Sequence, residues 1–480
     1  MLGLNTRLLT PLLRGTAPLR PLPEPRMCAS ASFATDALAE PPPAPQACYV
    51  HIPFCRRRCH YCDFPIQVVG DRESAADAAS EAYLQLLLRE IRASPSCADG
   101  DGAEGGRPLR SVYFGGGTPS LMPPRLLARL LDALRERHGF AADLECTLEM
   151  DPGTFDAERL SAFLAAGVTR VSLGVQSFDD ALLRACGRSH DLADAERAIA
   201  LLTSDAAASA GLTDVSVDLI GGLPHQSLAA WRTSLEAAAA SGAQHVSVYD
   251  LQVEDGTAFG SWYSEGVSPL PEEGVAAQMF REASAVLGAR GFERYEVSSF
   301  ARPGHRCRHN RAYWRNEPFW GFGLGATSHV GGRRLARPRR MDGYARWVDE
   351  LEARGWAAQQ AAGAGEAESA LDELQTRLML ALRTDAGVSA RELRAAYPGA
   401  LGAAAADACA DTAREVPAAW LAPPRDGDAG DGDAGDVLRL SDPEGLLFSN
   451  DAISTCFARL EERLEARRWK AVEVEVEVEV

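Results

Sequence analysis

The chain has 480 residues, a formal net charge of −18 at pH 7 and a pI near 5.1. This acidic balance argues against a nucleic-acid surface, because phosphate binding needs clustered Lys and Arg. No apolar run approaches the roughly 20 residues of a membrane helix, so we expect no transmembrane segment. Eleven cysteines with one tight cluster fit a reducing compartment better than a disulfide framework.

Residues 1–45 differ in composition from the rest of the chain. Four arginines stand against a single acid, Glu24, before Asp36, among Leu, Pro, Ser and Ala. An Arg-bearing, acid-poor leader is typical of an organellar transit peptide, and a disordered Pro-rich leader is the alternative. We expect import into a mitochondrion or a plastid, with the cytoplasm as the fallback.

A cysteine-rich loop follows the first predicted strand. Cys55, Cys59 and Cys62 have the spacing C-x3-C-x2-C. Three thiolates can bind three irons of a cubane iron–sulfur cluster, and the fourth iron then keeps an open site where a metal centre can do chemistry. His51 and His60 could instead complete a four-ligand zinc site. Both alternatives remain open at this point, and a disulfide is less favoured than either.

A glycine-rich turn, Gly115–Ser120, follows the second predicted strand. Consecutive glycines let the backbone N–H groups approach a ligand closely, since no Cβ stands in the way. A plain tight turn is the alternative.

Strand and helix patterns then alternate along the chain. A helix from Glu81 onward has one apolar face, after a predicted loop at Asp71–Ala79. Strands that alternate with helices indicate parallel βαβ units, and hence an α/β barrel or most of one. The predicted strands are Tyr49–Ile52, Ser111–Phe114, Glu145–Glu149, Thr169–Gly174, Val215–Ile220 and His245–Tyr249, and the later helices are Arg125–His138, Asp156–Ala166, Asp191–Leu202 and Leu228–Ala240.

Polar residues stand at or just after several of these strands. Glu149, Gln176 and Asp218 are examples, together with the cysteines and the glycine turn. Barrel enzymes place their chemistry at the C-terminal ends of the strands. Each residue alone could be a satisfied polar group, but the series predicts a site on one rim.

Past the barrel we expect a helix over Glu272–Arg290 and a strand over Glu293–Phe300. The segment that follows contains His309, Tyr313 and Trp314. An imidazole beside aromatic rings offers axial ligation and an apolar face, as a porphyrin requires. The alternative is a packed aromatic corner in which the histidine is hydrogen-bonded, and His329 is a weaker second candidate ligand.

The C-terminal part reads as mostly helical. The segment Ala403–Asp436, Ala-rich and then built of Asp-Gly repeats, is interpreted as a disordered insertion. The tail from Val472 alternates Val and Glu with strand periodicity, but its charge should keep it solvated. The predicted helices are Leu371–Arg383, Val388–Tyr397 and a last one ending near Leu464.

Several motifs together resemble the radical S-adenosylmethionine (SAM) superfamily, in its HemN/HemW branch. These are the cysteine loop with its flanking residues, the sequence GGGTPS and the sequence HNxxYW at 309–314. The HemN pattern has a further cysteine where this chain has Phe64, so the resemblance is closer to the HemW side. It implies a partial (β/α)6 barrel with a small, mostly helical C-terminal domain. It also implies that SAM contacts Tyr49, Tyr61, Gly116, Gly117, Thr118, Glu149, Gln176, Arg188 and Asp218.

The resemblance covers about residues 48–464, and together with the composition of both ends it predicts a division into five parts. These are the leader 1–45, the barrel 46–260, an extension 261–345 with the haem-binding segment, the C-terminal domain 346–464 with the insertion at 403–436, and the tail 465–480.

Three functions follow as hypotheses. The first is a haem chaperone that carries a 4Fe–4S cluster and SAM, receives electrons from a donor and passes haem to acceptor proteins. The second is an oxygen-independent coproporphyrinogen III dehydrogenase of porphyrin biosynthesis. The third is a zinc-stabilised barrel with a structural role.

Overall fold

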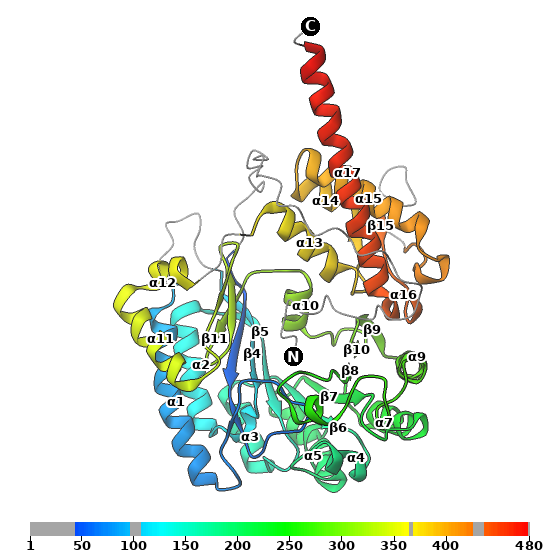
Figure 1. The fold of residues 1–480 in the computed structure, drawn as a ribbon. Coiled ribbons are helices and arrows are strands. Elements are labelled where there is room, and N and C mark those ends of the chain that lie inside the picture. The colour runs from blue at the N-terminus through cyan, green and yellow to red at the C-terminus, as the bar shows by residue number, and fades with distance from the viewer. Residues whose placement is uncertain (1–43, 97–106, 364–367, 426–435, 479–480) are drawn as a thin grey trace.

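The computed structural model describes residues 44–96, 107–363, 368–425 and 436–478. Its central element is one sheet of eleven strands in the order β13-β12-β11-β1-β4-β5-β6-β7-β8-β10-β9 (Figure 1). The two edge strands of this order, β13 and β9, do not pair with each other, so the sheet is an open, partial barrel. The strands of this sheet are β1 (Ala47–Ile52), β4 (Leu109–Gly116), β5 (Phe140–Met150), β6 (Arg170–Gln176), β7 (Asp214–Gly221), β8 (His245–Asp250), β9 (Glu293–Glu296), β10 (Ser299–Ala301), β11 (Phe319–Phe322), β12 (Thr327–Val330) and β13 (Arg333–Ala336).

The six strands predicted from the alternating pattern are confirmed as neighbours. From β1 through β4, β5, β6 and β7 to β8, each adjacent pair is parallel. Strand β11 adds a further parallel partner to β1, and antiparallel strands extend both edges. Because the predicted strands are parallel, their carboxyl ends meet on one rim.

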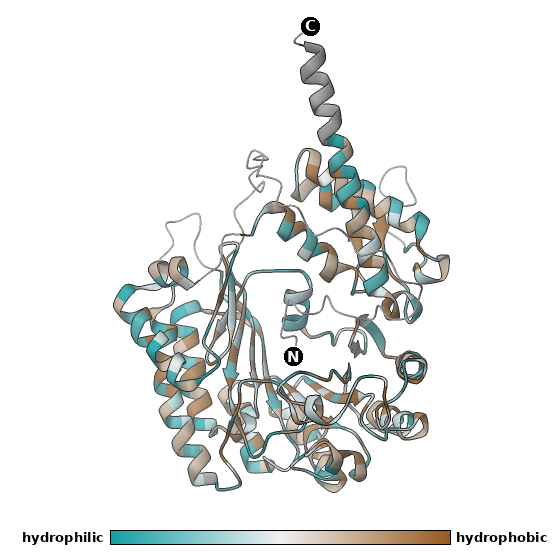
Figure 2. Cartoon of the chain, in the orientation of Figure 1, coloured by the Kyte–Doolittle hydropathy of each residue, from teal (hydrophilic) through white to brown (hydrophobic). Residues whose placement is uncertain are grey.

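Helices cover the sheet, and their buried faces are those that the apolar spacing predicts. On α1, Leu84, Leu87 and Ile91 are fully buried. Figure 2 shows helices that alternate between teal and brown, as helices with one buried face do. These helices are α1 (Glu73–Ala93), α2 (Pro124–His138), α3 (Ala157–Ala166), α4 (Asp180–Ala185), α5 (Leu192–Leu202), α6 (Asp205–Ser209), α7 (Leu228–Ala240), α8 (Ala258–Trp262), α9 (Glu273–Ala289), α10 (Arg308–Trp314), α11 (Met341–Arg354) and α12 (Trp356–Gly363).

Two local predictions were wrong. Helix α1 begins at Glu73, so most of the predicted loop at Asp71–Ala79 is helical, because its alanines favour helix although they carry little apolar signal. The predicted strand Glu293–Phe300 is a hairpin of β9 and β10. Its turn is held by Glu296, whose carboxylate accepts a hydrogen bond from the Ser298 amide at 2.9 Å.

The C-terminal region has a hydrophobic core of its own, which includes Leu378, Leu393 and Cys456. Its elements are α13 (Ala370–Ala381), β14 (Val388–Ser389), α14 (Ala390–Ala396), α15 (Ala400–Glu415), β15 (Val437–Leu438), α16 (Glu444–Leu447) and α17 (Ser449–Val478).

The predicted disorder of Ala403–Asp436 was wrong for its first part. Residues 403–415 belong to α15, whose alanines pack against α17, while residues 426–435 lie outside the described residues. Alanine has the best helix propensity, and its small side chain allows close packing between helices. The alternating Val and Glu residues from Val472 to Val478 continue the backbone of α17 as helix. Within the described ranges, no helix is both long and apolar enough to cross a bilayer.

Candidate functional site

The three cysteines lie on a loop whose two ends are joined by backbone hydrogen bonds. The short strands β2 (Phe54–Cys55) and β3 (Gln67–Val68) pair in parallel across the ends of this loop. Arg58 folds back and donates hydrogen bonds to the carbonyl oxygens of Cys62 at 3.1 Å, Phe64 at 3.2 Å and Ile66 at 3.4 Å. The loop is therefore built into the rim of the sheet, directly after β1.

All three thiols are free and half-buried. Burial raises the pKa of Cys55 to about 12 and that of Cys62 to about 11. Two sulfurs accept hydrogen bonds, Cys55 from the Thr118 hydroxyl at 3.5 Å and Cys59 from Arg188 Nη1 at 3.4 Å. A metal cluster would bring the positive charge that keeps these sulfurs as thiolates.

The two histidines of the zinc alternative, His51 and His60, make hydrogen bonds to other groups. Nε2 of His51 donates to the Pro65 carbonyl at 3.0 Å, and Nδ1 lies 3.0 Å from the Tyr49 hydroxyl. Nδ1 of His60 contacts the Ala185 carbonyl at 2.9 Å. Among the described residues, no three His, Cys, Asp or Glu side chains converge on one metal ion. Each thiolate of a cubane binds a different iron, so a cluster does not need the three sulfurs to meet at one ion.

The glycine turn packs against the strand that leads to the cysteines. A Cβ on Gly116 would lie 2.4 Å from the His51 ring, and one on Gly117 would lie 2.7 Å from the Phe54 carbonyl oxygen. The amides of Gly117 and Thr118 donate to the carbonyls of Ile52 and Phe54 at 2.8 and 2.7 Å. Both N–H groups therefore already donate hydrogen bonds within the chain. A ligand amino group at this turn would donate its own hydrogen bonds to carbonyl oxygens.

Two strand carboxylates, Glu149 on β5 and Asp218 on β7, accept hydrogen bonds from neighbouring residues of the sheet. Glu149 accepts hydrogen bonds from the Tyr113 hydroxyl at 2.9 Å and from the Gly116 amide at 3.0 Å. Burial raises the pKa of Glu149 to about 7. Asp218 accepts from the hydroxyls of Ser172 at 2.7 Å and Ser216 at 2.8 Å. Both acids have acceptor capacity left for ligand hydroxyls.

Arg188 ties the rim to the cysteine loop. Its Nη2 donates to Asp151 at 2.5 Å and to the Gly174 carbonyl at 2.7 Å, and its Nη1 donates to Cys59 and, at 3.3 Å, to the Tyr61 hydroxyl. The fifth N–H of a guanidinium is on Nε, which is buried without a partner among the described residues. This donor could bind a ligand carboxylate.

Of the remaining predicted SAM contacts, Gln176 lies on the same rim, and Tyr49 lies within β1, in register with Tyr113 of β4. Gln176 ends β6 with a φ of 69°, a left-handed conformation that is uncommon for a residue with a side chain. Tyr49 packs against Tyr113, with ring centroids 6.3 Å apart. The structure therefore brings together the cysteines and the residues predicted to contact SAM.

Asp151 and His190 are missing from the predicted set although they belong to this site. Asp151 directly follows β5, and its carboxylate contacts both Arg188 and His190. The available signal was a carboxylate two residues past the predicted strand Glu145–Glu149.

The predicted haem segment lies toward the opposite end of the strands. Helix α10 packs on β4, where Ser111 Oγ lies 3.1 Å from Nδ1 of His309. Gly116 follows Ser111 by five residues of strand, or about 17 Å at roughly 3.3 Å per residue. The ring of Tyr113, between them in sequence, stacks on His309 and also reaches Glu149.

His309 is a satisfied buried residue in this structure. It is 1% exposed, and its Nε2 lies 3.1 Å from the Tyr313 hydroxyl. Burial lowers its pKa to about 3. Nε1 of the buried Trp314 and Nδ1 of His329, by contrast, have no hydrogen-bond partner among the described residues. Iron ligation by His309 would thus require α10 to move.

The sequence of this chain is similar to those of several known proteins. Residues 49–238 match the model of the Radical SAM superfamily. The chain is 40% identical to the heme chaperone HemW of Synechocystis, over 87% of this chain and 98% of that protein. It is 37% identical to the bovine mitochondrial radical S-adenosyl methionine domain-containing protein 1, over 72% of this chain and 74% of that protein.

A solved structure gives the same fold. The coproporphyrinogen III oxidase HemN of Escherichia coli superposes with a TM-score of 0.68 at 24% identity, over 87% of this chain and 91% of that one. The predicted partial radical SAM barrel with a helical C-terminal region is thereby confirmed. Given the match to nearly the whole Synechocystis protein, this chain belongs to the HemW family of the radical SAM superfamily.

Proposed function

We propose that this protein is a haem chaperone that holds a 4Fe–4S cluster on Cys55, Cys59 and Cys62, binds SAM on the adjoining rim, and passes haem to acceptor proteins. One observation carries the proposal. Three free thiols stand beside Glu149 and Arg188 in a chain that matches a heme chaperone over 98% of that protein's length.

The residues of the rim provide the contacts that SAM would need. Glu149 and Asp218 can accept hydrogen bonds from ribose hydroxyls, and the free Nε–H of Arg188 can donate to the methionine carboxylate. A cluster with an open iron supplies one-electron chemistry on bound SAM, with electrons from a donor partner.

Haem binding is tested most directly at His309. We propose that α10 shifts when haem binds. His309 then breaks its contacts with Ser111 and Tyr313, and Trp314 packs on the porphyrin. The variant His309→Gln keeps a side chain that can hydrogen-bond to both hydroxyls but has no imidazole. We expect it to lose the Soret shift of the native protein in a haem titration, whereas His329→Gln should keep it. Unchanged binding by His309→Gln would remove haem from this segment.

An activity assay distinguishes the haem chaperone from the coproporphyrinogen III dehydrogenase. Phe64 stands where the HemN pattern has a cysteine, and we expect no consumption of coproporphyrinogen III under anaerobic conditions with reductant and SAM. Robust turnover would replace the chaperone proposal with the dehydrogenase.

We also propose an organellar location. The bovine and mouse relatives are named as mitochondrial proteins, and residues 1–45 have a transit-peptide composition. A fusion of residues 1–45 to a fluorescent protein should be imported into mitochondria or plastids. A diffuse cytoplasmic signal would contradict this.

A further inference from the structure

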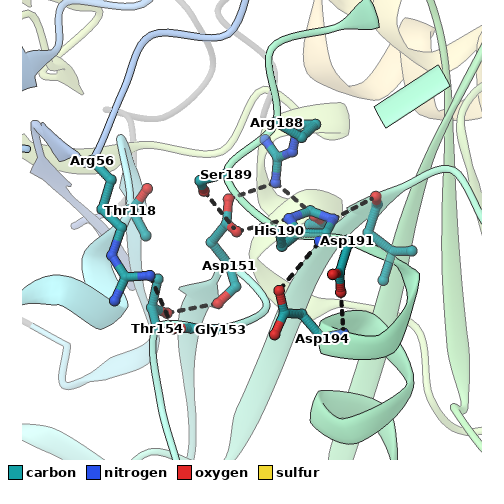
Figure 3. Close-up of polar contacts among 12 residues, drawn as sticks. Arg56, Thr118, Asp151, Gly153, Thr154, Arg188, Ser189, His190, Asp191 and Asp194 are labelled. Carbon is teal, nitrogen blue, oxygen red and sulfur yellow. Dashed lines mark hydrogen bonds and ion pairs between the residues drawn. The ribbon is translucent and has the colours of Figure 1, made fainter. Parts of the chain in front are cut away.

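The carboxylate of Asp151 contacts three consecutive residues of the loop that follows α4 (Figure 3). Arg188 Nη2 donates to Oδ2 at 2.5 Å, Nδ1 of His190 lies 2.9 Å from Oδ1, and the Ser189 hydroxyl lies 3.5 Å from the same oxygen. The side chains of Asp151, Arg188 and His190 are 12%, 8% and 0% exposed. Little water competes for these contacts, so the geometry of the group is well defined.

Asp151 and His190 are each anchored independently of Arg188. The Asp151 amide donates to the Ser120 hydroxyl at 3.3 Å, and its carbonyl accepts from the Thr154 hydroxyl at 2.6 Å. Nε2 of His190 donates to the Val175 carbonyl at 3.2 Å. Burial alone would raise the pKa of Asp151, but Arg188 and His190 together hold that pKa below its usual range. The anchored group is therefore a carboxylate, a strong acceptor for a guanidinium.

The anchored carboxylate fixes which way the guanidinium faces. With Nη2 held by Asp151 and the Gly174 carbonyl, Nη1 is directed at the Cys59 sulfur, 3.4 Å away. A hydrogen bond and a positive charge at a cluster sulfur favour the reduced, more negative cluster. Arg188 placed in this way should raise the reduction potential of a cluster held by Cys59.

We propose that Asp151 and His190 are positioning residues that hold Arg188 against the Cys59 sulfur and thereby raise the reduction potential of the cluster. This inference rests on the cluster of the proposed function. The inference goes beyond the proposed function because it gives Arg188 a role toward the cluster that is separate from the contact of Arg188 with SAM.

The test is an EPR-monitored redox titration of reconstituted protein without SAM or haem. Four proteins are compared: native, Arg188→Gln, Asp151→Asn, and the double variant. In the native background, Arg188→Gln should lower the midpoint potential. In the Asp151→Asn background, most of that lowering should disappear, because Arg188 is no longer held at the sulfur. Charges that act independently would instead give the same lowering in both backgrounds.

Asp156→Asn is the matched control. Asp156 is exposed, caps α3 through the Arg159 amide and makes no contact with Arg188, so Arg188→Gln should keep its full effect in that background. If Asp151→Asn does not load a cluster, His190→Gln serves as the second background, with the same expected loss of the Arg188 effect.

The outcomes separate this inference from the function on which it rests. Clusters that form in every variant and show equal lowering in the native and Asp151→Asn backgrounds would overturn the positioning role and leave the proposed function standing. If Arg188→Gln does not lower the midpoint potential in the native background, the positioning role is likewise overturned and the proposed function stands. Native protein that takes up no iron and sulfide would instead overturn the proposed function, and the inference with it.

Discussion

Hydrogen bonds at two of the three cysteine sulfurs are the most specific residue-level feature of this site. The donors are Thr118 at Cys55 and Arg188 at Cys59. Both donors were predicted from the family resemblance as SAM contacts, and nothing in their sequence context revealed that their partners in the folded chain are cysteines. A hydrogen-bond partner from a distant part of the chain depends on the tertiary structure, which residue spacing alone does not give.

Gly117→Ala tests how tightly the glycine turn packs on the cysteine loop. The new Cβ would lie 2.7 Å from the Phe54 carbonyl oxygen, which is backbone and cannot rotate away. We expect a loss of about 1–3 kcal/mol in the free energy of unfolding, measured by urea denaturation, because overpacking displaces backbone. Gly274→Ala in α9, where a Cβ meets nothing within 4 Å, is the control and should lose no stability. Equal stability of the two variants would contradict the packing.

Glu149 predicts a pH dependence of stability. Its pKa in the folded protein is about 7, above the ordinary value of 4.5, because burial disfavours the charge. Between these two values the folded state holds a proton that the unfolded state has lost, so the free energy of unfolding falls as pH rises. Glu149→Gln should remove this fall. The measurement is urea denaturation of cluster-free native and variant protein from pH 4.5 to 7, and parallel curves would refute the assignment.

At the scale of elements, the strands were predictable and two helical stretches were not. Runs such as Val215–Ile220 are apolar and β-branched, and a parallel strand buried on both faces has that composition. The first turns of α1 and most of α15 consist largely of alanine, whose helix propensity is high but whose apolar periodicity is weak. The hairpin of β9 and β10 was missed because its turn contains neither Gly nor Pro.

Helix α10 depends on a carboxylate at its N-terminus. Glu145, on β5, accepts hydrogen bonds from the amides of Arg308 at 2.9 Å and His309 at 3.1 Å, where a negative charge also meets the positive end of the helix dipole. Glu145→Ala should lower the free energy of unfolding by about 1.5–3 kcal/mol, the range for hydrogen bonds to charged groups.

Asp143→Ala provides the comparison for α10. Asp143 pairs with Arg308 and Arg110 at the surface, where its side chain is 53% exposed, so its loss should change stability by no more than about 0.5 kcal/mol. Thermal melts of both variants give the measurement. A larger loss from Asp143→Ala than from Glu145→Ala would show that the Glu145 carboxylate does not hold the helix.

At the scale of the whole molecule, the sheet separates two predicted sites. The cysteine loop, Glu149 and Arg188 lie at the carboxyl ends of the parallel strands, whereas α10 packs toward their other ends, with Tyr113 in contact with both regions. The rim was predictable because parallel strands bring their ends together whatever the loops do. The burial of His309 matches the alternative of a packed aromatic corner with a hydrogen-bonded histidine, although a short motif does not show which side of the sheet will cover it.

Metal analysis shows whether Cys55, Cys59 and Cys62 hold a 4Fe–4S cluster, on which the proposed function depends. Native protein and a variant with all three cysteines replaced by alanine are reconstituted anaerobically with iron and sulfide, desalted and analysed for iron, acid-labile sulfide and zinc. We predict about four irons and four sulfides per native chain and neither in the variant. Native protein that retains zinc without sulfide, or a variant that retains as much iron and sulfide as native protein, would contradict the account.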